Sequence, residues 1–339
     1  MSWGFRYEEV KSLEFSKSSA KTKIAIIGIG GCGCNTISNI YGISNQVLTI
    51  AVNTDALSLS KCRAHYKKII GLNETKGRGL AGDVELGYKL TRERANEVVN
   101  LASTDTDIFV LIAGLGGGTG SGGIVALSEY IKETLPEKLV WTIVTLPFEF
   151  EGVEKLENAK WALSKLLKVS DVVIVNSNDY VRRKFGASSI DRVFRIVDKH
   201  IADLIDSIIT ICNSEESLGP SIDLPIIEKV TKNAGLSHLG IGLSSEPIEA
   251  LNRALNDRYC EIDVRKCPSA VVYIEGPKRM LKLSVLEEIP KLLREKFEIS
   301  KVYWGVGVNW RLSELKVVLL VPQVKSSFIE SYLSTHAHG

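Results

Sequence analysis

Five glycines within seven residues constrain what this chain can fold into more than any other feature. Residues 116–122 are Gly-Gly-Gly-Thr-Gly-Ser-Gly; they follow the apolar stretch 108–113 and lead into the apolar residues 124–127. A buried strand that ends in glycines and continues as a helix presents backbone amides and a partial positive charge to an anion. Glycine lets phosphate approach the backbone, and Thr119 and Ser121 offer hydroxyl donors. The segment predicts a phosphate-binding loop, because a glycine-rich surface turn would not explain the flanking strand and helix patterns.

A second glycine run, at residues 28–35, directly follows the apolar residues 24–27. Its glycines match the spacing of the dinucleotide-binding fingerprint, and Asp55 stands about 20 residues further on, as that fingerprint requires. This run alone would indicate an NAD-dependent dehydrogenase. That alternative does not account for a second, richer glycine loop after a later strand. Two loops that converge on one ligand favour a mononucleotide with several phosphates.

The pattern of apolar residues predicts an α/β fold. Apolar runs expected to be strands alternate with segments of helical period, at residues 24–27, 48–52, 108–113, 140–146 and 172–175. Such alternation is typical of a parallel sheet covered by helices on both faces. We therefore expect a nucleotide-binding domain at residues 23–190, preceded by an N-terminal extension at residues 1–22.

The second half of the chain predicts a smaller α+β domain. Apolar residues at helical spacing indicate a long central helix at residues 191–212, which could brace two domains. Beyond it, helical segments mix with strands expected at residues 270–274, 302–308 and 315–321. We place this domain at residues 213–324 and a short tail at residues 325–339.

Charge and cysteine content limit which partners and which cellular compartment we expect. With 42 basic and 40 acidic residues the net charge is only +2, so we expect neither nucleic-acid binding nor direct membrane insertion. No apolar run approaches the roughly 20 residues that span a bilayer, and residues 1–23 lack the apolar centre of a signal peptide. The six cysteines include no Cys-x-x-Cys pair, which favours free thiols over a metal site. We expect a cytoplasmic protein.

The heptad at residues 116–122 resembles the signature loop of the tubulin and FtsZ superfamily, which wraps the phosphates of GTP. Residues 30–35 are similar to the family's first loop, a glycine run that ends in Asn, except that cysteines occupy two glycine positions. The family's Asn-Thr-Asp loop is present at residues 53–55, and residues 77–87 resemble the loop that senses the terminal phosphate. Side chains at Cys32 and Cys34 should narrow the room for nucleotide.

Three further segments extend the resemblance. Residues 147–152 resemble the family's Pro-Phe-x-Phe-Glu-Gly element, in which Glu151 would contact the ribose; Lys155 stands where the family has Arg. The family's base-recognition residues are matched by Asn178 and Asp191, and a carboxylate can accept hydrogen bonds from guanine but not from adenine. Two alternatives need no nucleotide. Glu151 and Lys155 would then lie on a solvent-exposed surface, and Asp191 would only cap the N-terminus of a helix.

The resemblance implies one set of GTP-binding residues. They are Gly30, Gly31, Cys32, Gly33, Cys34, Asn35, Asp55, Gly82, Gly116, Gly117, Gly118, Thr119, Gly120, Ser121, Glu151, Lys155, Asn178 and Asp191.

Departures from the family concentrate in the catalytic loop. In the family an Asn-x-Asp-x-x-acid pattern reaches into the neighbouring subunit's site and polarises the attacking water. Here Asp223 is retained, but Ser221 replaces the Asn and Ile226 replaces the second acid. Isoleucine can neither orient water nor accept a proton, so GTPase activity is expected to be weak or lost if nothing substitutes. Residues 235–242 resemble the family's Gly-Leu-Ala-His-Met-Gly-Ile-Gly strand and fix the alignment here.

Together these motifs predict an FtsZ-like GTPase that assembles head to tail into filaments for cell division or cell shape. The alternatives are a filament scaffold with little hydrolysis that acts beside a more active FtsZ-like paralogue, and a tubulin-like protein, which Ser121 suggests but the Phe-Glu-Gly element disfavours. Mg²⁺ would accompany GTP or GDP on phosphates and water, without metal-ligating residues of its own. Expected partners are the chain itself, such a paralogue or a division adaptor.

Overall fold

The computed structural model describes residues 21–43, 47–187, 189–213 and 221–334. The expected N-terminal extension therefore lies almost entirely outside the described residues. Six strands form the first half of the fold: β1 (Ile24–Ile29), β2 (Val47–Asn53), β3 (Tyr66–Ile69), β4 (Ile108–Gly114), β5 (Leu139–Leu146) and β6 (Val172–Ser177). Four strands belong to the second half: β7 (Gly235–Ser244), β8 (Ser269–Gly276), β9 (Lys301–Val308) and β10 (Leu315–Pro322).

Helices connect these strands. Those of the first half are α1 (Gly30–Ile40), α2 (Ala56–Lys61), α3 (Leu72–Thr75), α4 (Val84–Val99), α5 (Gly118–Thr134), α6 (Val153–Val169) and α7 (Asn178–Phe185). The long helix α8 (Ile190–Asn213) follows them. The remainder are α9 (Leu224–Thr231), α10 (Pro247–Asn256), α11 (Leu283–Lys296) and α12 (Ser327–Ser334).

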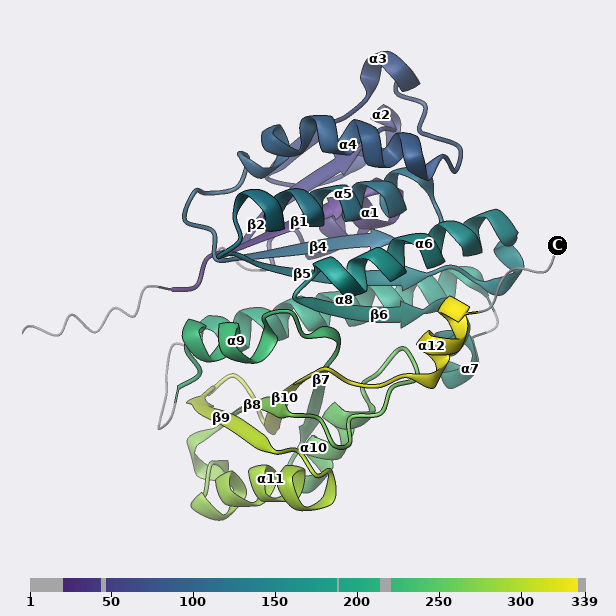
Figure 1. The fold of residues 1–339 in the computed structure, drawn as a ribbon. Helices are drawn as coiled ribbons and strands as arrows, with labels where there is room; N and C mark the ends of the chain where they lie inside the picture. The colour runs from purple at the N-terminus through teal and green to yellow at the C-terminus, as the bar shows by residue number, and fades with distance from the viewer. Residues whose placement is uncertain (1–20, 44–46, 188, 214–220, 335–339) are drawn as a thin grey trace, which may run out of the picture.

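The sheet confirms the α/β fold class. Its ten strands run in the order β3-β2-β1-β4-β5-β6-β7-β10-β8-β9, and the first seven pair in parallel (Figure 1). Within the first six the order reverses between β1 and β4, and ligands of such sheets bind outside the carboxyl ends of the strands at this point. The sheet also continues across the expected domain boundary, because β6 pairs with β7 through Val172–Gly235 and Val173–Leu236.

Helices cover both faces of the parallel strands. Because side chains alternate along a strand, Ile26 of β1 faces one apolar core and Ile27 the other. The first core contains Ile201 of α8, whereas the second contains Ile124 of α5 and Leu163 of α6. The predicted strands and the helices between them thus assemble because each strand is apolar on both faces.

Helix α8 lies between the two halves of the molecule (Figure 1). Its buried apolar residues belong to the same apolar core as Val318 and Leu320 of β10. Lys316 of β10 also forms an ion pair with Asp206 of α8, with 2.7 Å between Nζ and Oδ2. The apolar stripe expected at residues 191–212 is therefore the packing surface of a helix that contacts both sets of strands.

The expected tail, residues 325–339, contains a helix. Residues 327–334 form helix α12, whose Ile329 is only 3% exposed and packs in the core beneath α6. This segment has an apolar helical face, formed by Phe328, Ile329, Tyr332 and Leu333. The segment is too short for this pattern to predict a helix from the sequence.

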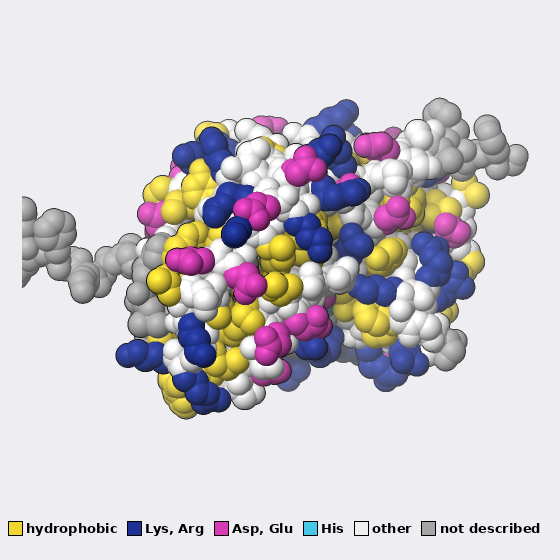
Figure 2. All heavy atoms as spheres, turned by 90° about the horizontal axis from the view of Figure 1, so that it is seen from below, with side chains coloured by type: hydrophobic (Ala, Val, Ile, Leu, Met, Phe, Trp, Pro, Cys, Tyr) yellow, Lys and Arg dark blue, Asp and Glu magenta, His cyan; other side chains and the backbone are white. Residues whose placement is uncertain are grey.

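The surface carries charges of both signs. Figure 2, seen from below, shows Lys and Arg side chains interspersed with Asp, Glu and exposed apolar side chains. Within the described part of the chain, no helix is both long and apolar enough to cross a membrane.

Candidate functional site

A cavity of about 460 Å³ lies at the carboxyl ends of β1 and β4, where the strand order reverses. Eleven of the residues predicted from the sequence line it: Gly31, Cys32, Asn35, Gly82, Gly117, Gly118, Thr119, Gly120, Glu151, Lys155 and Asn178. Eight do not line it: Gly30, Gly33, Cys34, Asp55, Gly116, Ser121, Asp191 and Asp223. Both glycine runs therefore border one cavity, as their positions after two neighbouring strands predict.

The N-termini of α1 and α5 meet at this cavity. A Cβ on Gly30 would lie 2.9 Å from the backbone nitrogen of Gly120, and a Cβ on Gly120 would lie 2.5 Å from the carbonyl oxygen of Gly114. Glycine at position 30 thus lets the two helix ends approach each other, and glycine at position 120 lets α5 lie against the end of β4. Neither helix has a side-chain N-cap among the described residues, so first-turn amides remain available to an anion.

Gly31 and Gly117 face open space. A Cβ placed on either would have no described atom within 4 Å, and Gly117 has ordinary extended dihedral angles, with φ −87° and ψ 156°. Neither packing nor backbone conformation therefore requires glycine at Gly117. The empty volume beside both glycines is suited to the oxygens of a phosphate group, and we refer to it as the cradle.

Hydroxyl groups stabilise the glycine turn. The hydroxyl of Thr119 lies 2.7 Å from that of Thr54, which follows β2. Ser121 accepts a hydrogen bond of 2.8 Å from the backbone N–H of Gly116, so its hydroxyl shapes the turn rather than the cavity. Asp55 caps α2 by accepting from the N–H of Ser58 at 2.8 Å and likewise serves the scaffold.

The two cysteines of the first loop have different environments. Cys34 is 1% exposed, with its Sγ 3.7 Å from the carbonyl oxygen of Val52, so it does not narrow the cavity as predicted. Cys32 does line the cavity and packs beside Gly114, where a Cβ would come within 2.7 Å of the Cβ of Cys32. Although Cys32 has exposed surface, the protein atoms packed around its thiol desolvate it and raise its pKa to about 12. The thiol is neutral beside the cradle.

Glu151 and Lys155 lie on one wall. Glu151 accepts a hydrogen bond of 2.9 Å from the N–H of Phe148, and its other oxygen lies 2.7 Å from the Nζ of Lys155. Backbone anchoring holds the carboxylate in place, and its charge draws the lysine toward the cavity. Glu151 is thus partly shielded, whereas the Lys155 side chain stays 51% exposed.

At the end of the cavity lined by α7 and α8, the residues depart from the predicted pair, Asn178 and Asp191. Asn178 is 4% exposed and lines the cavity, and its Oδ1 has no hydrogen-bond partner among the described residues. Asp191 instead lies outside, 72% exposed and paired with Arg195 at 2.7 Å. One face of α8 brings Phe194 and Asp198 to the cavity in its place.

Asp198 has the environment expected of a binding carboxylate. It is half-buried, and burial raises its pKa, although Asn39 donates a hydrogen bond of 3.2 Å to its Oδ2. The sequence carried no signal that singles it out, since Asp198 follows the buried Val197 just as Asp206 follows the buried Ile205 on the same helix. Other lining residues that lie outside the sequence motifs are Gly114, Leu115, Thr145, Phe194 and Val197.

Asp223 lies away from the cavity. It is exposed and caps α9, accepting a hydrogen bond of 3.2 Å from the N–H of Ile226. In Figure 1 α9 lies at the end of the molecule where the parallel strands begin, whereas the cavity lies where they end. Ile226 is partly buried against the apolar core.

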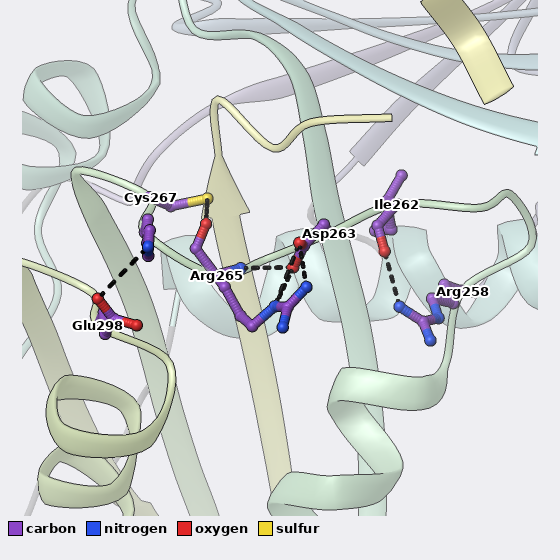
Figure 3. Close-up of polar contacts among 7 residues, drawn as sticks. Arg258, Ile262, Asp263, Arg265, Cys267 and Glu298 are labelled. Atoms are coloured by element: carbon purple, nitrogen blue, oxygen red, sulfur yellow. Dashed lines mark hydrogen bonds and ion pairs between the residues drawn. The ribbon is translucent and has the colours of Figure 1, made fainter. Parts of the chain in front are cut away.

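A second cavity, of about 670 Å³, is lined by residues of α7, α10 and the segment that follows α10. Figure 3 shows Arg265 paired with Asp263 through Nε–Oδ1 and Nη2–Oδ2 distances of 2.9 and 2.7 Å. This hydrogen-bonded pair lowers the pKa of Asp263 to about 2. Arg258 donates to the carbonyl of Ile262 at 2.7 Å. Acidic and basic side chains on the wall of this second cavity offset one another's charge. It therefore has no excess positive charge that would favour phosphate over the first cavity, which we call the glycine cavity.

Comparison with known proteins identifies the family. Residues 23–185 match the model of the Tubulin/FtsZ family, GTPase domain. The chain is 31% identical to cell division protein FtsZ 2 of Pyrococcus furiosus over 96% of this chain and 82% of the relative. It is 28% identical to cell division protein FtsZ 1 of Methanocaldococcus jannaschii over 96% of this chain and 92% of the relative.

Solved structures of other proteins share this fold. An empty FtsZ dimer from M. jannaschii superposes with a TM-score of 0.79 at 28% identity, covering 90% of this chain and 89% of that one. CetZ2 from Haloferax volcanii, solved as a GTPγS-bound protofilament, shares the fold with a TM-score of 0.80 at 22% identity, covering 92% and 96%. The dehydrogenase alternative is thereby excluded: the chain belongs to the tubulin/FtsZ family of GTPases.

Proposed function

We propose that this protein binds GTP in the glycine cavity, assembles head to tail into filaments, and hydrolyses GTP where two subunits meet. The observation that carries the proposal is the separation of Asp223 from the cavity, at opposite ends of the parallel strands (Figure 1). A carboxylate at one end can act on a nucleotide at the other end only in a neighbouring subunit. Contacts between two different faces do not close on themselves and give open filaments.

The residues of the cavity support a guanine nucleotide. Phosphates would occupy the space beside Gly31 and Gly117, with Glu151 and Lys155 toward the ribose. The unpartnered Oδ1 of Asn178 and the carboxylate of Asp198 would receive the base, with Asp198 in the role predicted for Asp191. A carboxylate accepts from the ring N–H and amino group of guanine, whereas adenine lacks that pair of donors.

Magnesium would enter with the nucleotide. Among the described residues, no group of three or more His, Cys, Asp or Glu side chains could hold a metal ion. Mg²⁺ keeps several waters and readily uses phosphate oxygens as ligands, so the cradle fits a Mg-nucleotide better than a free ion. Mg²⁺ would offset the negative charge of the phosphates. The chain's own residues would bind and orient the nucleotide.

A filament scaffold with little hydrolysis is the second candidate. It is favoured by Ile226, whose side chain packs against the core where the family has a second acid. The relatives named above are cell division proteins, which supports a role in division or cell shape, in the cytoplasm where GTP is available. A more active paralogue or a division adaptor would then be the partner.

Phosphate release and light scattering, followed together at increasing protein concentration, test this proposal. With GTP, we expect scattering above a critical concentration and phosphate release that rises more steeply than protein concentration. Filaments without phosphate release would favour the scaffold. Absence of GTP binding would overturn both candidates.

A further inference from the structure

Asn158, on the helix α6, connects two loops that border the phosphate end of the cavity. Its Nδ2 lies 2.8 Å from the carbonyl oxygen of Gly82 and 3.0 Å from that of Gly116. A primary amide carries two hydrogens, so one nitrogen satisfies both acceptors. Two carbonyls at this spacing also fix the orientation of the amide, because the opposite orientation would place three oxygens together.

Both acceptors belong to turns that depend on glycine. Gly82 has φ +97° and Gly116 has φ +107°, values that other residues rarely adopt. A Cβ on Gly82 would also lie 2.4 Å from Oε1 of Glu154, one helical turn before Asn158 on α6. The carbonyl directions are therefore set by the backbone, and Asn158 is placed to receive both.

These turns hold residues that face the nucleotide. Gly82, together with Leu80 and Ala81, lines the cavity on one side, and Gly117, next to Gly116, lines it on the other. Asn158 joins the two turns through direct hydrogen bonds to protein atoms, the carbonyl oxygens of Gly82 and Gly116.

We infer that Asn158 is a positioning residue that holds the loop around Gly82 against the glycine turn before nucleotide arrives. This inference rests on the proposed GTP site. A pre-formed loop lowers the ordering cost of binding, and the benefit should grow with the number of phosphates that the loop contacts. If loss of the bridge leaves the closed loop about 10% populated, triphosphate affinity falls about tenfold. GDP affinity should change much less.

Two substitutions at Asn158 test the hydrogen bonds of the bridge separately from the packing of the side chain. Asn158→Leu keeps the size of the side chain but cannot donate, and Asn158→Asp directs a carboxylate at two carbonyl oxygens and should open the loop further. The same changes at Asn252 of α10, which lies outside the glycine cavity, serve as matched controls.

Hydrogen exchange of nucleotide-free protein gives the first readout. We expect faster exchange at residues 80–83 and 116–118 in both Asn158 variants, larger for Asp, with the Asn252 variants unchanged. Unchanged exchange in the Asn158 variants would overturn the inference even if GTP binds normally.

Equilibrium binding of fluorescent GTP and GDP gives the second readout. The ratio of GTP to GDP affinity should fall about tenfold in Asn158→Leu, which a general loss of stability would not produce. Equal losses for both nucleotides would overturn the positioning role. Failure of the unmodified protein to bind either nucleotide would instead contradict the proposed function, while the exchange data would still test the bridge.

Discussion

Thr54 and Thr119, which are 65 residues apart in sequence, place their hydroxyl oxygens 2.7 Å apart beneath the glycine turn. Thr54 is fully buried and Thr119 is 8% exposed. Their hydrogen bond joins the end of β2 to the first turn of α5, so the Asn-Thr-Asp loop supports the glycine turn from below. Residues 53–55 stabilise the site without lining the cavity, whereas Thr119 of the glycine turn does line it.

Replacing Thr54 with Val should lower the free energy of unfolding by about 1–3 kcal/mol, because it leaves the Thr119 hydroxyl buried without this partner. Urea denaturation measures the change. The double variant Thr54→Val, Thr119→Val removes both hydroxyls and should cost less than the sum of the single variants. Strict additivity would show that the hydroxyls do not interact.

Guanine selectivity should depend on Asp198 rather than Asp191. Asp198→Asn removes the charge that would accept from guanine and should weaken GTP binding about 10- to 100-fold, the range for charge-assisted hydrogen bonds. Asp191→Asn changes an exposed carboxylate and should leave affinity within about twofold. Titration with GTP and ATP measures both; the reverse ranking would restore Asp191 as the base-recognition residue.

The contrast between these two acids shows what sequence patterns can and cannot predict. The apolar strands and both glycine loops were predictable because local composition specifies them, whereas the partly exposed edge strand β3 was not expected. The choice between Asp191 and Asp198 depends on which face of α8 points at the cavity, and this follows from packing with both halves of the fold. In the same way, Cys34 lies inside a predicted loop yet points into the core, because α1 begins at Gly30 and turns that side chain away.

Acid should destabilise the protein through His238. This residue is 2% exposed, its Nε2 lies 2.9 Å from the carbonyl oxygen of Ala254, and burial lowers its pKa from 6.5 to about 4. The unfolded chain therefore binds a proton more readily than the folded one. Stability is fully present above about pH 6.5 and is lost as pH falls toward 4, by roughly 3 kcal/mol in total.

Urea midpoints of the parent protein and of His238→Gln, measured from pH 7.5 to 4.5, isolate this contribution. Gln can still donate to Ala254 but does not titrate, so the parent should lose more stability than the variant across this range. Parallel pH profiles would exclude His238 as the source.

Gly117→Val should abolish nucleotide binding without unfolding the protein. The added side chain has no described neighbour within 4 Å of its Cβ, and the extended dihedral angles of Gly117 suit a β-branched residue. It would fill space beside the glycine turn that phosphates need. We expect an unchanged or slightly higher melting temperature and loss of GTP binding in the same preparation; tight GTP binding by this variant would place the phosphates elsewhere.

Mixing two inactive variants tests whether each site is built from two subunits. Asp223→Asn retains a good N-cap for α9 but removes the carboxylate, so it should fold normally and lose most turnover. Gly117→Val cannot bind nucleotide but keeps Asp223. If Asp223 acts on the neighbour's nucleotide, a mixture should recover part of the turnover that neither variant shows alone, because some contacts pair an intact cavity with an intact Asp223. If the mixture stays inactive while the two variants form filaments together, Asp223 does not act across the contact.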